Sequence, residues 1–115
     1  FFGGKPEKTG YIVGALKDAN EKMNHELYKY QEGSDDQWRP VNGAMVYLLD
    51  SRGVAIRAYH TDGEYNGIFV FDDVKPGKYT LRYEAYGYQT STEKIEVKAD
   101  KTTYLKPKIR KIITK

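Results

Sequence analysis

The sequence contains no cysteine among its 115 residues. Disulfide bonds and thiolate-bound zinc therefore cannot stabilise the fold, although this absence leaves every redox compartment open. Long apolar runs are also missing, and none approaches the roughly 18 residues that a membrane-spanning helix requires. We therefore expect no transmembrane segment in this chain.

A strong excess of charge of one sign is missing as well. The 19 basic and 16 acidic residues are mixed along the chain and give a formal net charge of +3. An excess of this size affects solubility but is not typical of a nucleic-acid-binding domain. Nucleic acid is therefore not an expected partner.

Catalytic motifs are scarce. His25 lies in a polar segment and His60 at the end of an expected strand, and the sequence has neither a nucleophile elbow nor a His-x-x-Glu-His spacing. Catalysis needs a nucleophile or an acid–base pair held together by neighbouring groups. The sequence therefore indicates no enzyme, and we predict no catalytic residue, cofactor or resident metal.

What the sequence does contain is an alternation of apolar and polar residues, interrupted by turn residues. This pattern is typical of half-buried strands at short spacing. It favours an all-β fold, a seven-stranded antiparallel Greek-key sandwich of the transthyretin-like or immunoglobulin-like kind. The expected strands are Tyr11 to Leu16, Ala44 to Leu49, Val54 to His60, Ile68 to Phe71, Lys78 to Ala85, Thr90 to Val97 and Thr102 to Ile109.

The alternation also predicts which side chains face the core. Tyr79, Leu81 and Tyr83 share one face of their strand, because successive side chains of a strand point to opposite sides. Phe69 and Phe71 are expected to join them from the preceding strand. A second set of rings is expected to face outward as a flat patch for a neighbouring domain: Tyr47, Tyr59, Tyr86 and Tyr104.

Residues 17–39 form a polar insertion between the first two expected strands, far longer than a hairpin loop. Met23, Leu27 and Tyr30 recur at helical spacing, and Asn20 is a suitable N-cap. We therefore expect a short helix over about Asn20 to Tyr30 within this insertion.

The domain organisation follows from these segments. The chain opens with FFGGKPEKTG, without an initiator Met or a signal peptide, so we expect residues 1–9 to be a linker from a longer parent chain. Residues 10–112 are expected to form the sandwich, including the 17–39 insertion, and residues 113–115 a C-terminal tail.

Four motifs in order resemble the carboxypeptidase regulatory-like domains, a transthyretin-like branch of the β-sandwiches. They are IVGALKD from Ile12, PVNGAMVYL from Pro40, TDGEYNGIFVF from Thr61 and PGKYTLRYEAYGY from Pro76. The resemblance implies a non-catalytic accessory domain of a secreted, periplasmic or cell-surface bacterial multidomain protein. Such a domain acts as a spacer or protein-docking module, with neighbouring domains of the same parent protein as its partners. The long insertion departs from the family pattern.

Adhesin domains on similar sandwiches form a Lys–Asn isopeptide bond promoted by a glutamate buried in a Tyr-x-Leu-x-Glu strand. Here the strand register places Tyr83 at that glutamate's position, and Glu84 is expected on the opposite face. We therefore expect no isopeptide bond.

The alternative function is carbohydrate binding through the aromatic residues of the insertion. Trp38, Tyr28 and Tyr30 lie away from the predicted core, and exposed rings of this kind stack on pyranose faces. The competing interpretation, which we favour, is that Trp38 closes one end of the sandwich and the tyrosines anchor the loop.

Two further segments leave an alternative open. A calcium-binding loop is partly matched by Asp62, Glu64, Asn66 and Gly67, with Asp73. The adjacent strand must extend where such a loop curls, so we favour a polar hairpin.

The tail from Lys106 to Lys115 carries basic and no acidic residues. This composition favours a lysine-protected edge strand or a connector over a contact with acidic glycans or lipid head groups.

Overall fold

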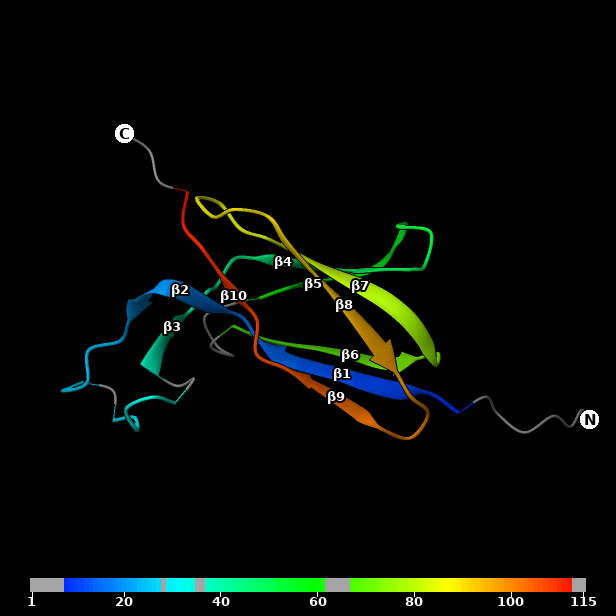
Figure 1. The fold of residues 1–115 in the computed structure, drawn as a ribbon, viewed down its shortest axis with the longest axis horizontal. Coiled ribbons are helices and arrows are strands. Elements are labelled where there is room, and N and C mark those ends of the chain that lie inside the picture. Colours follow the sequence, from blue (N-terminus) through cyan, green and yellow to red (C-terminus); the bar gives the residue numbers. More distant parts are fainter. Residues whose placement is uncertain (1–7, 28, 35–36, 62–66, 113–115) are drawn as a thin grey trace, which may run out of the picture.

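The computed structural model describes residues 8–27, 29–34, 37–61 and 67–112 (Figure 1). In these ranges the chain forms ten strands and no α-helix. The strands are β1 (Gly10–Ala15), β2 (Lys17–Lys22), β3 (Trp38–Pro40), β4 (Met45–Leu49), β5 (Ala55–His60), β6 (Ile68–Val74), β7 (Gly77–Glu84), β8 (Ser91–Val97), β9 (Thr102–Leu105) and β10 (Lys108–Ile109).

The strands assemble into three sheets. A four-stranded sheet has the order β5-β4-β7-β8, and two three-stranded sheets have the orders β6-β1-β9 and β10-β2-β3. Figure 1 shows the four-stranded sheet above β6-β1-β9, with β10-β2-β3 beyond one end of that pair. The expected all-β sandwich is confirmed.

The number of strands and two of the pairings differ from the expectation. β1 continues into β2, and the strand expected from Thr102 to Ile109 is divided into β9 and β10 at Pro107, which has no backbone N–H to donate. The two halves pair in parallel with the chain's first strands, β9 with β1 and β10 with β2. The sandwich is therefore not wholly antiparallel.

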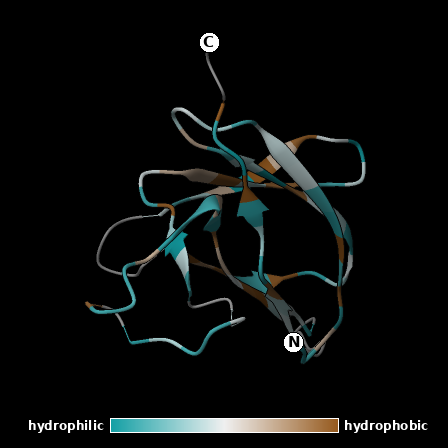
Figure 2. Ribbon diagram, turned by 60° about the vertical axis from the view of Figure 1, so that its left-hand side comes forward, coloured by the Kyte–Doolittle hydropathy of each residue, from teal (hydrophilic) through white to brown (hydrophobic). Residues whose placement is uncertain are grey.

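The hydrophobic core lies between the four-stranded sheet and the sheet β6-β1-β9. Phe69, Phe71, Leu81 and Tyr83 are buried as predicted, and Tyr79 packs half-buried against them. Figure 2 shows the hydrophobic stretches mainly on the strands, while the loops are mostly hydrophilic. Gly14 of β1 leaves room for the Phe69 ring, because a Cβ there would come within 2.4 Å of it.

The predicted helix over about Asn20 to Tyr30 was wrong. Residues up to Lys22 belong to β2, residues 25–27 form a turn, and Leu27 is 74% exposed. β2 pairs with both β3 and β10, so contacts between distant segments outweigh the helical spacing of the apolar residues. No helix among the described residues is long and apolar enough to cross a membrane.

Tyr86 and Tyr104 are exposed as predicted, but the four tyrosines do not form the predicted patch. Tyr59 turns toward the core, and its ring lies 6.2 Å from that of Phe71. Tyr47 lies beneath the guanidinium of Arg82 on the four-stranded sheet, whereas Tyr104 is an exposed residue of β9 in another sheet. The rings therefore do not share one surface.

Gly67, directly before β6, provides a test of this packing. Its φ is +78°, and a Cβ would lie 2.6 Å from the carbonyl oxygen of Leu16. Gly53 has a similar φ of +81°, with nothing within 4 Å of an added Cβ. We expect Gly67→Ala to lower the free energy of unfolding by about 2–4 kcal/mol, and Gly53→Ala by about 1 kcal/mol, since both carry the backbone strain but only the first carries the clash. Urea denaturation of the two variants measures the difference.

Candidate functional site

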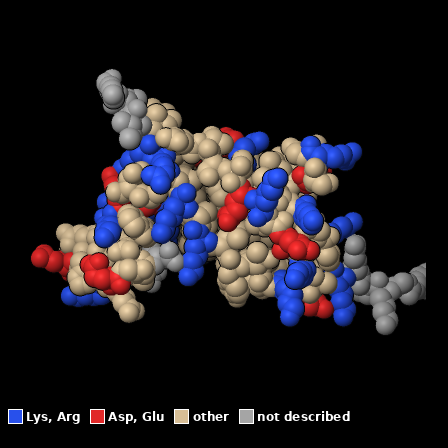
Figure 3. Space-filling model, in the orientation of Figure 1, with Lys and Arg blue, Asp and Glu red and all other residues tan. Residues whose placement is uncertain are grey.

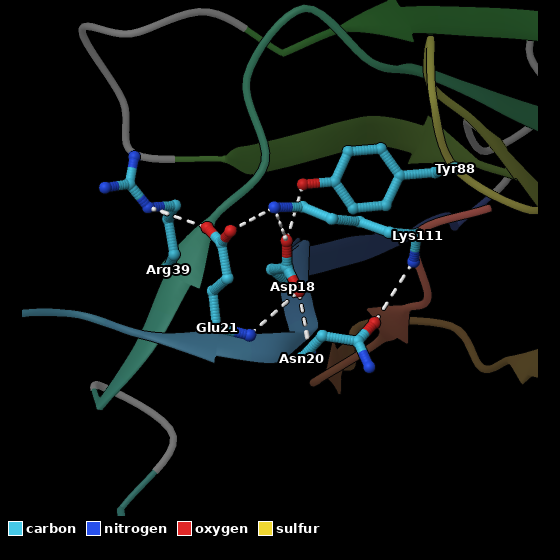
Figure 4. Close-up of polar contacts among 6 residues, drawn as sticks. All are labelled: Asp18, Asn20, Glu21, Arg39, Tyr88 and Lys111. Atoms are coloured by element: carbon cyan, nitrogen blue, oxygen red, sulfur yellow. Dashed lines mark hydrogen bonds and ion pairs between the residues drawn. The ribbon is translucent and has the colours of Figure 1, made fainter. Parts of the chain in front are cut away.

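The most highly connected polar group of the described chain is centred on Asp18 of β2, which is fully buried (Figure 4). Its Oδ1 accepts hydrogen bonds from the backbone N–H groups of Asn20 at 2.6 Å and Glu21 at 3.0 Å. Its Oδ2 accepts a hydrogen bond from the Tyr88 hydroxyl at 2.6 Å and lies 3.8 Å from Nζ of Lys111. Four groups therefore surround one buried carboxylate.

The cluster extends from Asp18 to the neighbouring segments. Lys111 also forms an ion pair with Glu21, whose carboxylate lies 3.3 Å from Nε of Arg39 in β3. The backbone N–H of Lys111 donates to the side-chain oxygen of Asn20 at 3.1 Å. We name this group of residues the Asp18 cluster; it joins β2, β3, the turn after β7 and the segment after β10 (Figure 4).

The protonation states in the cluster follow from these contacts. Burial alone would raise the pKa of the Asp18 carboxyl, but the hydrogen bonds from Tyr88 and the two backbone N–H groups, with the charge of Lys111, hold it below its usual value. Burial and the hydrogen bond to Asp18 raise the pKa of the Tyr88 hydroxyl. The pair is therefore a carboxylate and a protonated phenol at neutral pH. The carboxylate thereby holds the backbone of β2 and the side chains of Tyr88 and Lys111 together.

This arrangement predicts a dependence of stability on pH. A carboxyl group whose pKa is lower in the folded state stabilises the fold above its unfolded pKa, and the contribution is lost as the pH falls through the folded pKa. We expect the wild type to exceed Asp18→Asn in unfolding free energy by a constant amount above about pH 5, and the difference to shrink below about pH 3.8. Urea denaturation between pH 2 and 7 measures it, and a difference independent of pH would contradict the assignment.

Of the three residues proposed for glycan binding, the structure places two. Trp38 is half-buried at the start of β3, and its ring centre lies 5.6 Å from Nζ of Lys22 and 5.0 Å from Nζ of Lys108. Tyr30 donates its hydroxyl proton to the carbonyl oxygen of Met23 and meets the His25 ring edge-on. Tyr28 lies outside the described residues. Trp38 and Tyr30 are thus held by different neighbours, which gives no support to a shared sugar-stacking platform.

The structure describes both histidines and part of the calcium-loop pattern. Nε2 of His25 lies 3.1 Å from the Tyr30 carbonyl oxygen, and His60 is an exposed strand-end residue. Residues 62–66 of the calcium-loop pattern lie outside the described residues, while Asp73 accepts a hydrogen bond from Thr9 at 2.8 Å. The described residues include no group of three or more His, Cys, Asp or Glu suited to hold a metal ion.

The predicted orientation of Tyr83 toward the core and of Glu84 toward the opposite face is confirmed. Tyr83 is buried, and its hydroxyl donates to Glu93 at 2.8 Å, an arrangement in which burial and this carboxylate raise the pKa of Tyr83. Glu84 lies on the other face, where it forms an ion pair with Arg82 at 2.6 Å. The residue at the promoting position is therefore a tyrosine.

An exposed apolar strip on the outer face of β6-β1-β9 was missed by the sequence analysis. Val13 of β1 pairs with Val70 on one side and with Tyr104 on the other, and Tyr11 and Ile68 are exposed beside them. The signal was present, because the sequence YIVGAL at the start of β1 is apolar on both faces instead of alternating. We name these residues the β1 strip.

Comparison with protein families matches residues 34–110 to the carboxypeptidase regulatory-like domain. This match covers more than half of the chain. The chain belongs to the carboxypeptidase regulatory-like domain family. The match begins within the insertion, so the first of the four motifs lies outside it. A comparison with curated proteins found no match.

Solved structures similar to this domain come from proteins of different activity. GBS52, the minor pilin in Streptococcus agalactiae, has a TM-score of 0.66 at 16% identity, over 95% of this chain and 47% of its own. BcpA, the major pilin subunit of Bacillus cereus, has a TM-score of 0.57 at 20% identity, over 91% and 31%. Catechol 1,2-dioxygenase from Pseudomonas arvilla C-1 has a TM-score of 0.57 at 13% identity, over 97% and 55%.

These similarities establish the fold. The domain spans less than two thirds of each of the three proteins. Because the sandwich occurs in pilins and in a dioxygenase, the fold alone does not determine an activity.

Proposed function

We propose that this domain is a non-catalytic spacer within a bacterial multidomain protein that is secreted or displayed on the cell surface, with residues 10–112 as its folded unit. The observation that carries the proposal is the path of the chain. The N-terminal and C-terminal ends of the described chain lie toward opposite ends of the longest axis in Figure 1, and the principal-axis extents are 59 × 33 × 22 Å. Domains attached at the two ends are thereby held apart.

The terminal segments are tied to the sandwich by several independent contacts. β1 lies between β6 and β9, so the entering strand has a neighbour on each side. The leaving segment is held by β10, by the Asp18 cluster and by an isolated bridge between Tyr88 and Lys111. These contacts favour a spacer that fixes both the distance and the relative orientation of the domains attached at its two ends. The surface location is supported by the resemblance to the two pilins, each of which contains more than this one domain.

The absence of native cysteine makes the spacer proposal directly testable. Spin labels at Lys8→Cys and Arg110→Cys report the end-to-end distance by electron-electron double resonance. We expect one narrow distance distribution, and a broader one when Asp18→Ala is added. A distribution that is broad without the additional substitution contradicts a rigid spacer.

We also propose that the β1 strip contacts a neighbouring domain of the same parent protein. It surrounds the strand through which the chain enters the sandwich, so a preceding domain lies within reach, and Tyr104 in it is 76% exposed. Methyl NMR spectra of Val13, Ile68 and Val70 in the isolated domain and in the parent chain provide the test. We expect these shifts to differ between the two samples while that of the buried Leu48 stays the same; unchanged strip shifts contradict the contact.

A further inference from the structure

The outer face of β10-β2-β3 carries several lysines around Trp38, the protein's one tryptophan. Lys108 pairs with Lys17 across β10 and β2, and Lys22 pairs with Trp38 across β2 and β3. Paired residues of neighbouring strands project to the same side of a sheet. The ammonium groups of Lys22 and Lys108 both lie within 6 Å of the Trp38 ring centre. We name these four residues the Trp38 face.

The local backbone of β2 separates this face from the acidic residues. Asp18 accepts the N–H groups of Asn20 and Glu21, and the register of β2 with β3 shifts between Lys17 and Lys22. A bulge of this kind re-aims the following side chains. Glu21 consequently lies on the Asp18 side, where it meets Lys111 and Arg39 (Figure 4). Lys22 instead reaches the Trp38 face.

The charge around this face is concentrated. Segments 17–22, 37–40 and 106–112 contain seven basic and two acidic residues, a local excess of five where the whole chain has an excess of three. The two acidic residues, Asp18 and Glu21, already have cationic partners in the Asp18 cluster. Among the described residues, no carboxylate forms an ion pair with Lys17 or Lys22. Figure 3 shows basic side chains gathered over the part of the molecule that contains β2 and β10.

We propose that the Trp38 face binds an acidic polysaccharide. Two ammonium groups over the indole ring disfavour stacking of a neutral sugar, but they place cations where the carboxylates of a uronic-acid chain would lie. The ring restrains both lysine side chains, so binding immobilises less side-chain freedom than at two free lysines. An extended strand surface with charges on two neighbouring strands, β2 and β10, fits a linear polyanion. This inference goes beyond the spacer function and does not depend on it.

Trp38 itself is the reporter for the test, because its fluorescence comes from the face alone. The probe is an oligogalacturonate of about ten residues, titrated into the domain at low and moderate salt, with a maltooligosaccharide of equal length as the neutral comparison. We expect a saturable change with oligogalacturonate, none with maltooligosaccharide, and weaker binding as salt rises, because counterions are released on binding. No response to oligogalacturonate at millimolar concentration overturns the proposal.

Matched variants distinguish the face from general charge. Lys22→Gln with Lys108→Gln is expected to weaken binding at least tenfold, and Lys78→Gln with Lys94→Gln, two exposed lysines of the four-stranded sheet, by less than twofold. Equal losses in the two double variants overturn the proposal. Tighter binding of phosphatidylglycerol vesicles or of single-stranded DNA than of oligogalacturonate also overturns it, because the face would then be a lipid or nucleic-acid site. Thermal melting of both variants shows that each loss arises in the folded domain.

Discussion

Replacing Asp18 by alanine is expected to destabilise the domain by about 3–5 kcal/mol, because removal of one partner from a buried ionic cluster leaves the others without compensation. In this variant the Tyr88 hydroxyl and the backbone N–H groups of Asn20 and Glu21 lose their acceptor. Lys111 retains Glu21 but loses its buried neighbour. The segment after β10 should therefore loosen first.

Asp50→Ala is the matched control for this prediction. The Asp50 carboxylate also accepts two backbone N–H groups, those of Arg52 at 2.9 Å and Val54 at 3.0 Å, but in a turn open to solvent. We expect it to cost about 1 kcal/mol, the usual value for one side-chain acceptor of turn N–H groups. Urea denaturation followed by circular dichroism compares the two variants. If Asp18→Ala costs no more than Asp50→Ala, the cluster is not a stabilising element.

Phe69→Ala is the second substitution with a large expected effect, about 3–5 kcal/mol, since it removes a buried ring and leaves a cavity. Phe69 is completely buried, and its ring centre lies 6.2 Å from that of Phe71 and 5.9 Å from that of Tyr83. Its ring contacts Tyr83 of β7 and so joins the sheet β6-β1-β9 to the four-stranded sheet. The loss should therefore reduce the stability of the whole sandwich.

The neighbouring residue provides the comparison. Val70 follows Phe69 in β6 but faces outward and is 38% exposed, so Val70→Ala is expected to cost less than about 1 kcal/mol. Thermal and urea unfolding of the two variants test whether β6 buries one face and exposes the other. Similar losses in the two variants would show that β6 does not bury one face against the opposing sheet.

The core was predictable from the sequence because its pattern is local. Within two short segments, apolar residues alternate with polar or exposed ones; the apolar residues are Phe69, Phe71, Leu81 and Tyr83. A period of two in a strand places these side chains on one face. The class of the fold followed from the repetition of that pattern. Tyr59 was misplaced because the alternation gives two faces without stating which one the core covers.

The Asp18 cluster was not predictable because its members are distant in the sequence. Tyr88 and Lys111 are 70 and 93 positions from Asp18. Nothing in KDANEK predicts a buried carboxylate, and the helical spacing farther along misdirected the interpretation of this segment. Trp38 was identified as a candidate from its position in a polar insertion. The lysines that lie over its ring come from β2 and β10, and the sequence around Trp38 does not predict these contacts.

The two ends of this domain are held by parallel strand pairs, which a stretching force would load along their length. Single-molecule pulling through Lys8→Cys and Arg110→Cys acts on β1 against β9 and on β2 against β10, so many hydrogen bonds must break together. Pulling through Ser51→Cys and Lys78→Cys acts at the adjoining ends of β4 and β7, where Leu49 pairs with Thr80 and the bonds open one after another. We predict one unfolding event at clearly higher force for the first pair of attachment points. Equal forces in the two geometries, or gradual extension through the chain ends, would contradict the account.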